Sequence, residues 1–88
     1  MTTSSKPALT REQVHATLWQ MTAEQIGKQL SDLTPKSRLV QDLGADSLDA
    51  TELGMQVEEK LSVTLPEELF ENPDLTLGEI EEAIWAQR

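Results

Sequence analysis

The chain has 88 residues, no cysteine and a formal net charge of −9 at pH 7, which indicates one small domain without a disulfide framework. Residues 1–41 carry five basic and three acidic side chains, whereas residues 42–88 carry two basic and thirteen acidic ones. This charge argues against nucleic acid as a partner and favours proteins with basic surfaces, and no apolar run approaches the ~18 residues of a membrane span.

The N-terminal part is predicted to contain a tail followed by one helix. Residues 1–9 are expected to be flexible, and no signal-peptide pattern opens the chain. A helix is predicted over residues 10–25, with Thr10 as N-cap and Gln13 completing a capping box. Gly27 can end this helix in the left-handed conformation. Its apolar stripe consists of Val14, Leu18 and Met21.

Residues 28–45 are predicted to form a long loop that packs over the helices. The loop has too many apolar side chains to leave in water, namely Leu30, Leu33, Leu39, Val40 and Leu43. Pro35 marks a turn within it. A structured loop of this length often has a functional reason.

Residues 42–49 read Asp-Leu-Gly-Ala-Asp-Ser-Leu-Asp and open a strongly acidic segment. Gly44 can take the positive φ that a sharp turn needs. Asp46 is a good N-cap, and Asp49 is placed as the acidic partner of a capping box. Ser47 is then the first helical residue, with its hydroxyl facing solvent beside the partial positive charge of a helix N-terminus. The sequence therefore predicts a site for a phosphate ester at Ser47.

The remaining elements are also predicted to be helical, and no run supports a strand. A second helix is expected over residues 47–61, with Ala50, Leu53, Val57 and Leu61 facing the core. Residues 66–70 can form a short third helix with proline at its first position. The last helix is expected over residues 76–86, opened by a capping box of Thr76 and Glu79. The predicted fold is all-α: a small four-helix bundle with a long loop between helices 1 and 2 and a short helix 3.

The octapeptide of residues 42–49, followed by Glu52-Leu53 and Glu58-Glu59, resembles the attachment motif of acyl carrier proteins. The resemblance covers nearly the whole chain and implies a carrier domain over residues 10–88. It implies that Ser47, flanked in the cofactor-binding motif by Asp46 and Leu48, carries 4′-phosphopantetheine as a phosphodiester. The terminal thiol of this arm would carry an acyl group as a thioester. The resemblance also implies a cytoplasmic monomer that is a carrier and not an enzyme.

A small docking surface is predicted on the outer side of the second helix, where apolar residues are ringed by carboxylates. The resemblance implies that partner enzymes bind there, and the residues concerned are Leu48, Asp49, Glu52, Met55, Glu58 and Glu59. The expected partners are a phosphopantetheinyl transferase, a ketosynthase, an acyltransferase and other acyl-processing enzymes with basic docking surfaces.

The sequence leaves the pathway open between alternatives. Residues 65–76 resemble the third-helix region of polyketide and peptide-synthetase carriers, which favours a free-standing carrier of a polyketide or specialised fatty-acid pathway. The first half, through Glu59, resembles carriers of bacterial fatty-acid synthesis, so a housekeeping carrier is the near alternative and an aminoacyl carrier is the third. The alternative from another class is an unmodified acidic helical module that binds a basic partner.

The sequence gives little support for a catalytic site or a metal site. His15 is the only histidine, and nothing indicates that it lies near Ser47 as a catalytic base would. The acidic residues around Ser47 lack the spacing of a calcium loop, so no dedicated metal site is expected.

Gly54 is the one unusual residue inside the second helix, where glycine costs about 1 kcal/mol relative to alanine. We expect it to widen an interior groove that shelters the acyl chain. The bundle would then bury the chain between its second, third and fourth helices, and replacing Gly54 by alanine would raise helix stability.

Overall fold

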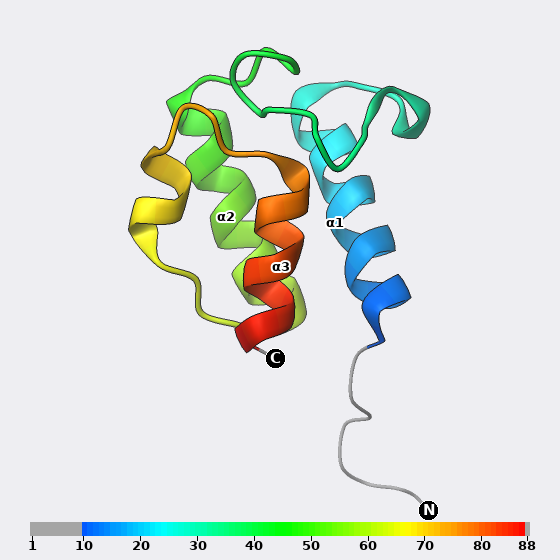
Figure 1. Cartoon of the computed structure of the whole chain (residues 1–88), viewed down its shortest axis with the longest axis vertical. Helices are drawn as coiled ribbons and strands as arrows, with labels where there is room; N and C mark the ends of the chain where they lie inside the picture. The colour runs from blue at the N-terminus through cyan, green and yellow to red at the C-terminus, as the bar shows by residue number, and fades with distance from the viewer. Residues whose placement is uncertain (1–9, 88) are drawn as a thin grey trace, which may run out of the picture.

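The computed structural model describes residues 10–87, and the predicted tail, residues 1–9, lies outside these described residues. Three α-helices pack together: α1 (Arg11–Ile26), α2 (Ser47–Leu61) and α3 (Leu77–Gln87). Two 3-10 helices, η1 (Leu30–Asp32) and η2 (Glu67–Glu71), lie in the connections (Figure 1). Residues 10–87 contain no β-strand, and none of their helices combines the length and hydrophobicity needed to cross a bilayer.

The all-α prediction is confirmed, but a bundle of four α-helices is not, because the expected short third helix is a 3-10 helix. Pro66 is its N-cap, and the amide of Leu69 donates to the Pro66 carbonyl at 3.1 Å. The segment ends at Asn72, which has an extended backbone because the following Pro73 disfavours the α-conformation there. The six residues between the two prolines favour a short 3-10 segment over a stable α-helix.

The starts of the three α-helices follow the local sequence as predicted. Each is opened by a capping box in which side chain and backbone bond reciprocally. The pairs are Thr10 with Gln13, Asp46 with Asp49, and Thr76 with Glu79. At the end of α1, Gly27 takes the predicted left-handed conformation with φ at +70°.

The core forms where the three α-helices meet. Each contributes side chains that are at most 1% exposed: Val14 and Leu18 from α1, Leu53 and Val57 from α2, and Ile80 and Ile84 from α3. The inward stripe predicted for α2 is confirmed, since Ala50, Leu53, Val57 and Leu61 are all buried. Leu33, Leu39 and Leu43 of the long loop complete the core, whereas Leu30 and Val40 are exposed, contrary to the prediction for those two.

The long loop is fastened to the segment that opens α3, although the two are distant in sequence (Figure 1). The Leu39 amide donates to the Leu75 carbonyl at 3.0 Å, and the Leu77 amide donates to the Ser37 carbonyl at 3.0 Å. The Gly78 amide donates to the Pro35 carbonyl at 2.8 Å. The loop is therefore a fixed part of the fold that positions the start of α2.

Gly78→Ala is expected to lower the free energy of unfolding by about 1–2 kcal/mol, because the new methyl overpacks a rigid contact. A Cβ at this position would lie 2.9 Å from the Pro35 carbonyl oxygen, a backbone atom that cannot swing away. Urea unfolding of the two proteins measures the difference. Gln87→Ala, at an exposed site on the same helix, should change the free energy by less than about 0.5 kcal/mol; equal effects of both substitutions would contradict the prediction.

Candidate functional site

The turn before α2 is held rigidly by residues on both sides of Gly44. Leu43 and Ala45 are buried, and Gly44 takes a φ of +76°. The Ala45 amide donates to the Leu39 carbonyl at 2.9 Å, and the Gly44 amide donates to the Val40 carbonyl at 3.2 Å. The predicted role of Gly44 in a sharp turn is thus confirmed, and the turn fixes where the next helix begins.

Ser47 is the first residue of α2 and is exposed to solvent. The Asp46 carboxylate accepts from the Asp49 amide at 2.8 Å, and the first intrahelical bond runs from the Ala50 amide to the Asp46 carbonyl at 3.0 Å. The helix geometry therefore leaves the amides of Ser47 and Leu48 without an intrahelical acceptor. An exposed hydroxyl beside two such amides fits a phosphate ester, whose oxygens these amides can bind.

A charged pair lies in the turn that precedes this serine. Asp42 accepts hydrogen bonds from the backbone amide of Arg38 at 2.9 Å and from its guanidinium at 3.3 Å. These bonds from Arg38 hold the pKa of the Asp42 carboxyl below its ordinary value. Arg38 also lies 3.8 Å from Asp74, so this cation offsets part of the negative charge around the start of α2.

The two apolar residues predicted for docking are exposed on α2. Leu48 is 62% and Met55 is 63% exposed. Glu59 is also exposed. Met55 and Glu59 line a shallow depression together with Glu52 and Gln56, so acidic and apolar groups meet on this side of the helix.

The other predicted docking carboxylates have partners within the fold. Asp49 closes the capping box with Asp46. Glu52 accepts from the Gln25 side chain of α1 at 3.0 Å. Glu58 is half-buried and accepts from the Leu65 amide at 2.7 Å, so its carboxylate orders the chain after α2. Sequence periodicity placed Glu58 on the outer face but gave no signal of this bond, because it depends on how the chain folds back.

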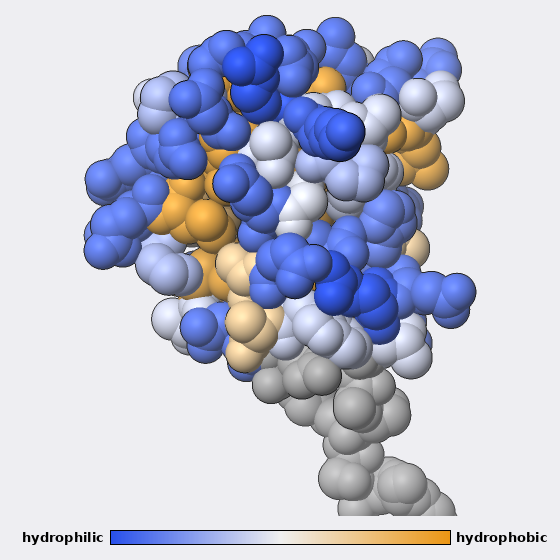
Figure 2. All heavy atoms as spheres, in the orientation of Figure 1, coloured by the Kyte–Doolittle hydropathy of each residue, from blue (hydrophilic) through white to orange (hydrophobic). Residues whose placement is uncertain are grey.

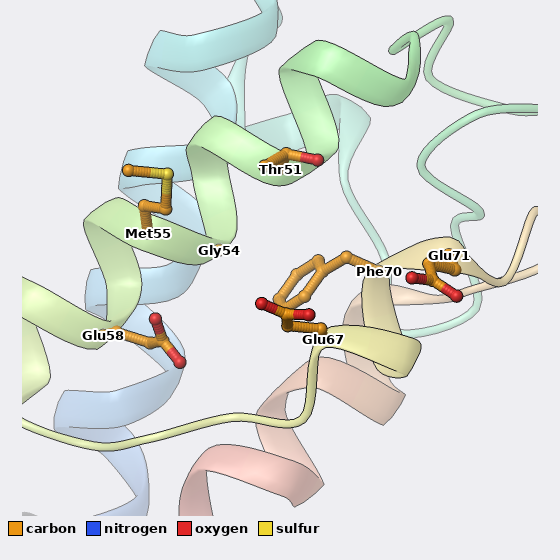
Figure 3. A pocket seen from close by; sticks show the side chains of 7 residues that line it. All are labelled: Thr51, Gly54, Met55, Glu58, Glu67, Phe70 and Glu71. Carbon is orange, nitrogen blue, oxygen red and sulfur yellow. The ribbon is translucent and has the colours of Figure 1, made fainter.

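A pocket of about 340 Å³ lies between α2 and η2 (Figure 3). Its lining consists of Thr51, Gly54, Met55, Glu58, Glu67, Phe70 and Glu71. Figure 2 shows hydrophobic surface where these two elements lie side by side, surrounded by hydrophilic residues. The pocket therefore combines an apolar wall with a rim of carboxylates.

The interior groove expected at Gly54 stays a prediction: Gly54 lines the pocket between α2 and η2, and the ring of Phe70 lies against it. A Cβ at Gly54 would lie 2.9 Å from Cε2 of Phe70, so the aromatic ring occupies the space that the missing side chain leaves. The gain in stability from Gly54→Ala stays a prediction, and the added methyl would require the ring of Phe70 to shift.

A polar cluster joins α1 to α3 away from this site, and the sequence gave no sign of it. Glu81 of α3 accepts from Arg11 and from His15 of α1, each at 2.7 Å. His15 is therefore paired with Glu81, and a Ser-His-Asp arrangement with Ser47 finds no support. No group of three or more metal-ligating side chains occurs in the described part of the chain.

Comparison with known proteins defines the class of this site. Residues 16–84 match the family described as "Phosphopantetheine attachment site". The chain is 36% identical over 72 residues to an acyl carrier protein of Exiguobacterium sibiricum, covering 82% of this chain and 90% of that protein. It is 49% identical over 49 residues to an acyl carrier protein of Helicobacter pylori (strain G27), covering 56% of this chain and 63% of that protein.

The chain therefore belongs to the phosphopantetheine-binding family, and its relatives there are acyl carrier proteins. The resemblance inferred from residues 42–49 is confirmed. The prosthetic group is 4′-phosphopantetheine, and the protein is a carrier and not an enzyme.

Proposed function

We propose that Ser47 is the attachment residue for 4′-phosphopantetheine, within a motif that also includes Asp46 and Leu48. The observation that carries the proposal is the exposed hydroxyl at the first position of α2, beside two amides without an intrahelical acceptor. The bound group supplies a terminal thiol on which an acyl chain is held as a thioester. The protein itself supplies an accessible hydroxyl, a helix N-terminus suited to phosphate and a rigid turn that fixes both.

The modification needs coenzyme A and a phosphopantetheinyl transferase. The Ser47 oxygen forms a new bond to the phosphorus of the pantetheine arm, and the bond between the two phosphates of coenzyme A breaks. Adenosine 3′,5′-bisphosphate leaves, and the hydroxyl proton passes to a base of the transferase. The only histidine of the chain is paired with Glu81, so it is not placed to act as this base.

We further propose that the acyl intermediates belong to a polyketide or specialised fatty-acid pathway, as the resemblance of residues 65–76 favours. A housekeeping fatty-acid-synthesis carrier is the second candidate, favoured by the resemblance of the first half of the chain, through Glu59, to carriers of bacterial fatty-acid synthesis. A ketosynthase and an acyltransferase with basic docking surfaces remain the predicted partners, and the cytoplasm remains the predicted location. Identification of the thioesters on protein purified from its native host decides between the pathways.

Intact mass measurement tests the attachment. Co-expression with a broad-specificity phosphopantetheinyl transferase is expected to add the mass of one phosphopantetheine group, and peptide mapping should place it on Ser47. An unmodified protein under conditions where a known carrier is fully converted would instead favour the acidic interaction module.

The exposed apolar residues of α2 are proposed to anchor partner enzymes. Leu48→Ala is expected to raise the KM of the transferase for this carrier roughly ten-fold, as the loss of ~1.4 kcal/mol of contact predicts. Met55→Ala should act in the same direction. Steady-state kinetics of arm transfer measure both.

Leu30→Ala is the matched control, because Leu30 is 55% exposed but lies in η1 outside α2. Its KM should equal that of the wild type. A KM that is unchanged in the Leu48 and Met55 variants would remove these residues from the docking surface.

A further inference from the structure

The space beside Gly54 is filled by an aromatic ring. A Cβ built on Gly54 would lie 2.9, 3.0 and 3.1 Å from three carbons of the Phe70 ring. These distances are shorter than ordinary van der Waals contact, so the ring rests directly on the backbone of α2. Figure 3 shows the ring of Phe70 extending from η2 toward Gly54. The glycine thus makes room for Phe70, and the two residues together form part of the wall of the pocket between α2 and η2.

The ring stands between the pocket and the interior. Phe70 is half-buried and packs against the hydrophobic core. Val57 and Ile80 in that core are 0% exposed. An alkyl chain entering from the pocket would have to displace the ring before it reached them. Closely packed side chains resist such an insertion.

The outer part of the pocket is unsuited to a long alkyl chain as well. Glu58, Glu67 and Glu71 bring three carboxylates to its lining, as Figure 3 shows. A chain lying across this rim would remove charged oxygens from water, which is unfavourable unless new polar partners replace the water. The apolar wall of the pocket includes the ring of Phe70, which packs against the hydrophobic core behind it.

We propose that Phe70 is the residue that limits the cargo of this carrier, so that short acyl groups are its substrate class and longer alkyl chains are not sheltered inside the fold. The inference rests on the proposed attachment at Ser47 and narrows the cargo of that same site. It replaces the expectation that the bundle buries the acyl chain. The pair of Phe70 and Gly54 determines this specificity through shape, without contact to the reacting atoms.

The test compares carriers loaded with arms of increasing chain length. Wild-type protein and Phe70→Ala are modified by a broad-specificity transferase with coenzyme A, butyryl-, octanoyl- and hexadecanoyl-coenzyme A. The melting temperature of each product is then followed by circular dichroism. Wild-type forms should agree within about 1 °C, whereas the octanoyl form of Phe70→Ala should melt on the order of 5 °C above its unacylated form. Shortening the side chain opens the space that the alkyl chain then fills.

Leu69→Ala is the matched control, since Leu69 is a half-buried neighbour in η2 that contributes none of the three atoms nearest to a Cβ at Gly54. It should lower the melting temperature without creating any dependence on chain length. Phe70→Leu is the second variant, used where Phe70→Ala does not fold. Its melting temperature should depend on acyl chain length less strongly than that of Phe70→Ala. The NMR chemical shifts of the Gly54 and Ile80 amides give a readout independent of stability. They should change on octanoylation in Phe70→Ala but not in the wild type.

A wild-type melting temperature that rises with chain length would overturn the inference. A melting temperature that does not change with chain length in either Phe70 variant would overturn it as well. Intact mass of the same samples reports attachment separately, so a loaded protein with the wrong melting behaviour refutes only the role of Phe70. If no arm is attached, the proposed function fails. Octanoylpantetheine added in solution to wild type and Phe70→Ala then gives the same comparison through the Gly54 and Ile80 shifts.

Discussion

Replacing Ser47 by alanine is expected to abolish attachment of phosphopantetheine and to leave the fold intact. Ser47 is exposed at the first helical position, and its hydroxyl bonds to no other described residue. The N-cap bonds are made by Asp46 and Asp49, and alanine is the best helix former. The melting temperature should therefore stay within about 2 °C of the wild type, while the mass gain after transferase treatment falls from one arm to none.

Ser31→Ala is the control for this experiment, because Ser31 is an exposed serine in η1. It should accept the arm at the wild-type rate. Ser47→Cys replaces the hydroxyl by a thiol of similar size and shape. It therefore tests whether attachment of the arm requires the oxygen atom itself. An arm that still appears on Ser47→Ala would move the attachment site elsewhere, and a collapse of the fold would show that Ser47 has a structural role.

The elements of this fold that could be predicted are those set by neighbouring residues. The capping pair of Asp46 and Asp49 specifies the start of α2 within three residues, and the turn at Gly44 requires only the positive φ that glycine supplies. The buried stripe of α2 follows from helical periodicity. The attachment site could be predicted for the same reason, since its components lie within residues 42–49.

The contacts that could not be predicted join residues far apart in sequence. The use of the space at Gly54 by Phe70 depends on how η2 returns to α2. The bond from the Leu65 amide to Glu58 depends on the same return of the chain. A pattern of apolar and polar residues shows which faces turn inward, but not which side chain fills a given space. For this reason the sequence indicates free space beside Gly54 but not that the ring of Phe70 packs against it.

The pairing of Glu81 with α1 is the clearest case of such a distant contact. Glu81 belongs to an acidic run, and its side chain would be expected in solvent, yet it is only 12% exposed. It accepts from Nε of Arg11 and from Nδ1 of His15, each at 2.7 Å. His15 in turn stacks on Trp19 with ring centroids 3.8 Å apart. Glu81 therefore links α3 to α1 through two partners on consecutive turns of one helix.

Glu81→Ala is accordingly expected to lower the free energy of unfolding by about 2–3 kcal/mol, because it removes two charge-assisted hydrogen bonds from a largely buried carboxylate. A change of this size corresponds to a fall of roughly 10 °C in melting temperature for a domain of this length. Glu82→Gln is the matched control. Glu82 is the next residue along α3 and also bonds to Arg11, but its side chain is 68% exposed, so its loss should cost less than about 1 kcal/mol.

The same pairing predicts how stability depends on pH. Burial raises the pKa of Glu81, but the hydrogen bonds from Arg11 and His15 outweigh it, so the pKa lies below its ordinary value of 4.5. A folded pKa below the unfolded one means that the ionised carboxylate stabilises the native state above the unfolded value. This stabilisation is lost as the pH falls below about 4.5 through the folded pKa.

Urea unfolding between pH 3 and pH 7 measures this contribution. The wild-type free energy of unfolding should fall more steeply below about pH 4.5 than that of Glu81→Gln, because the glutamine has no proton to take up. The paired Asp42, whose pKa is lowered by Arg38, contributes with the same sign in both proteins and so cancels in the comparison. Parallel curves would show that the link between Glu81 and α1 does not hold the carboxylate in its ionised form.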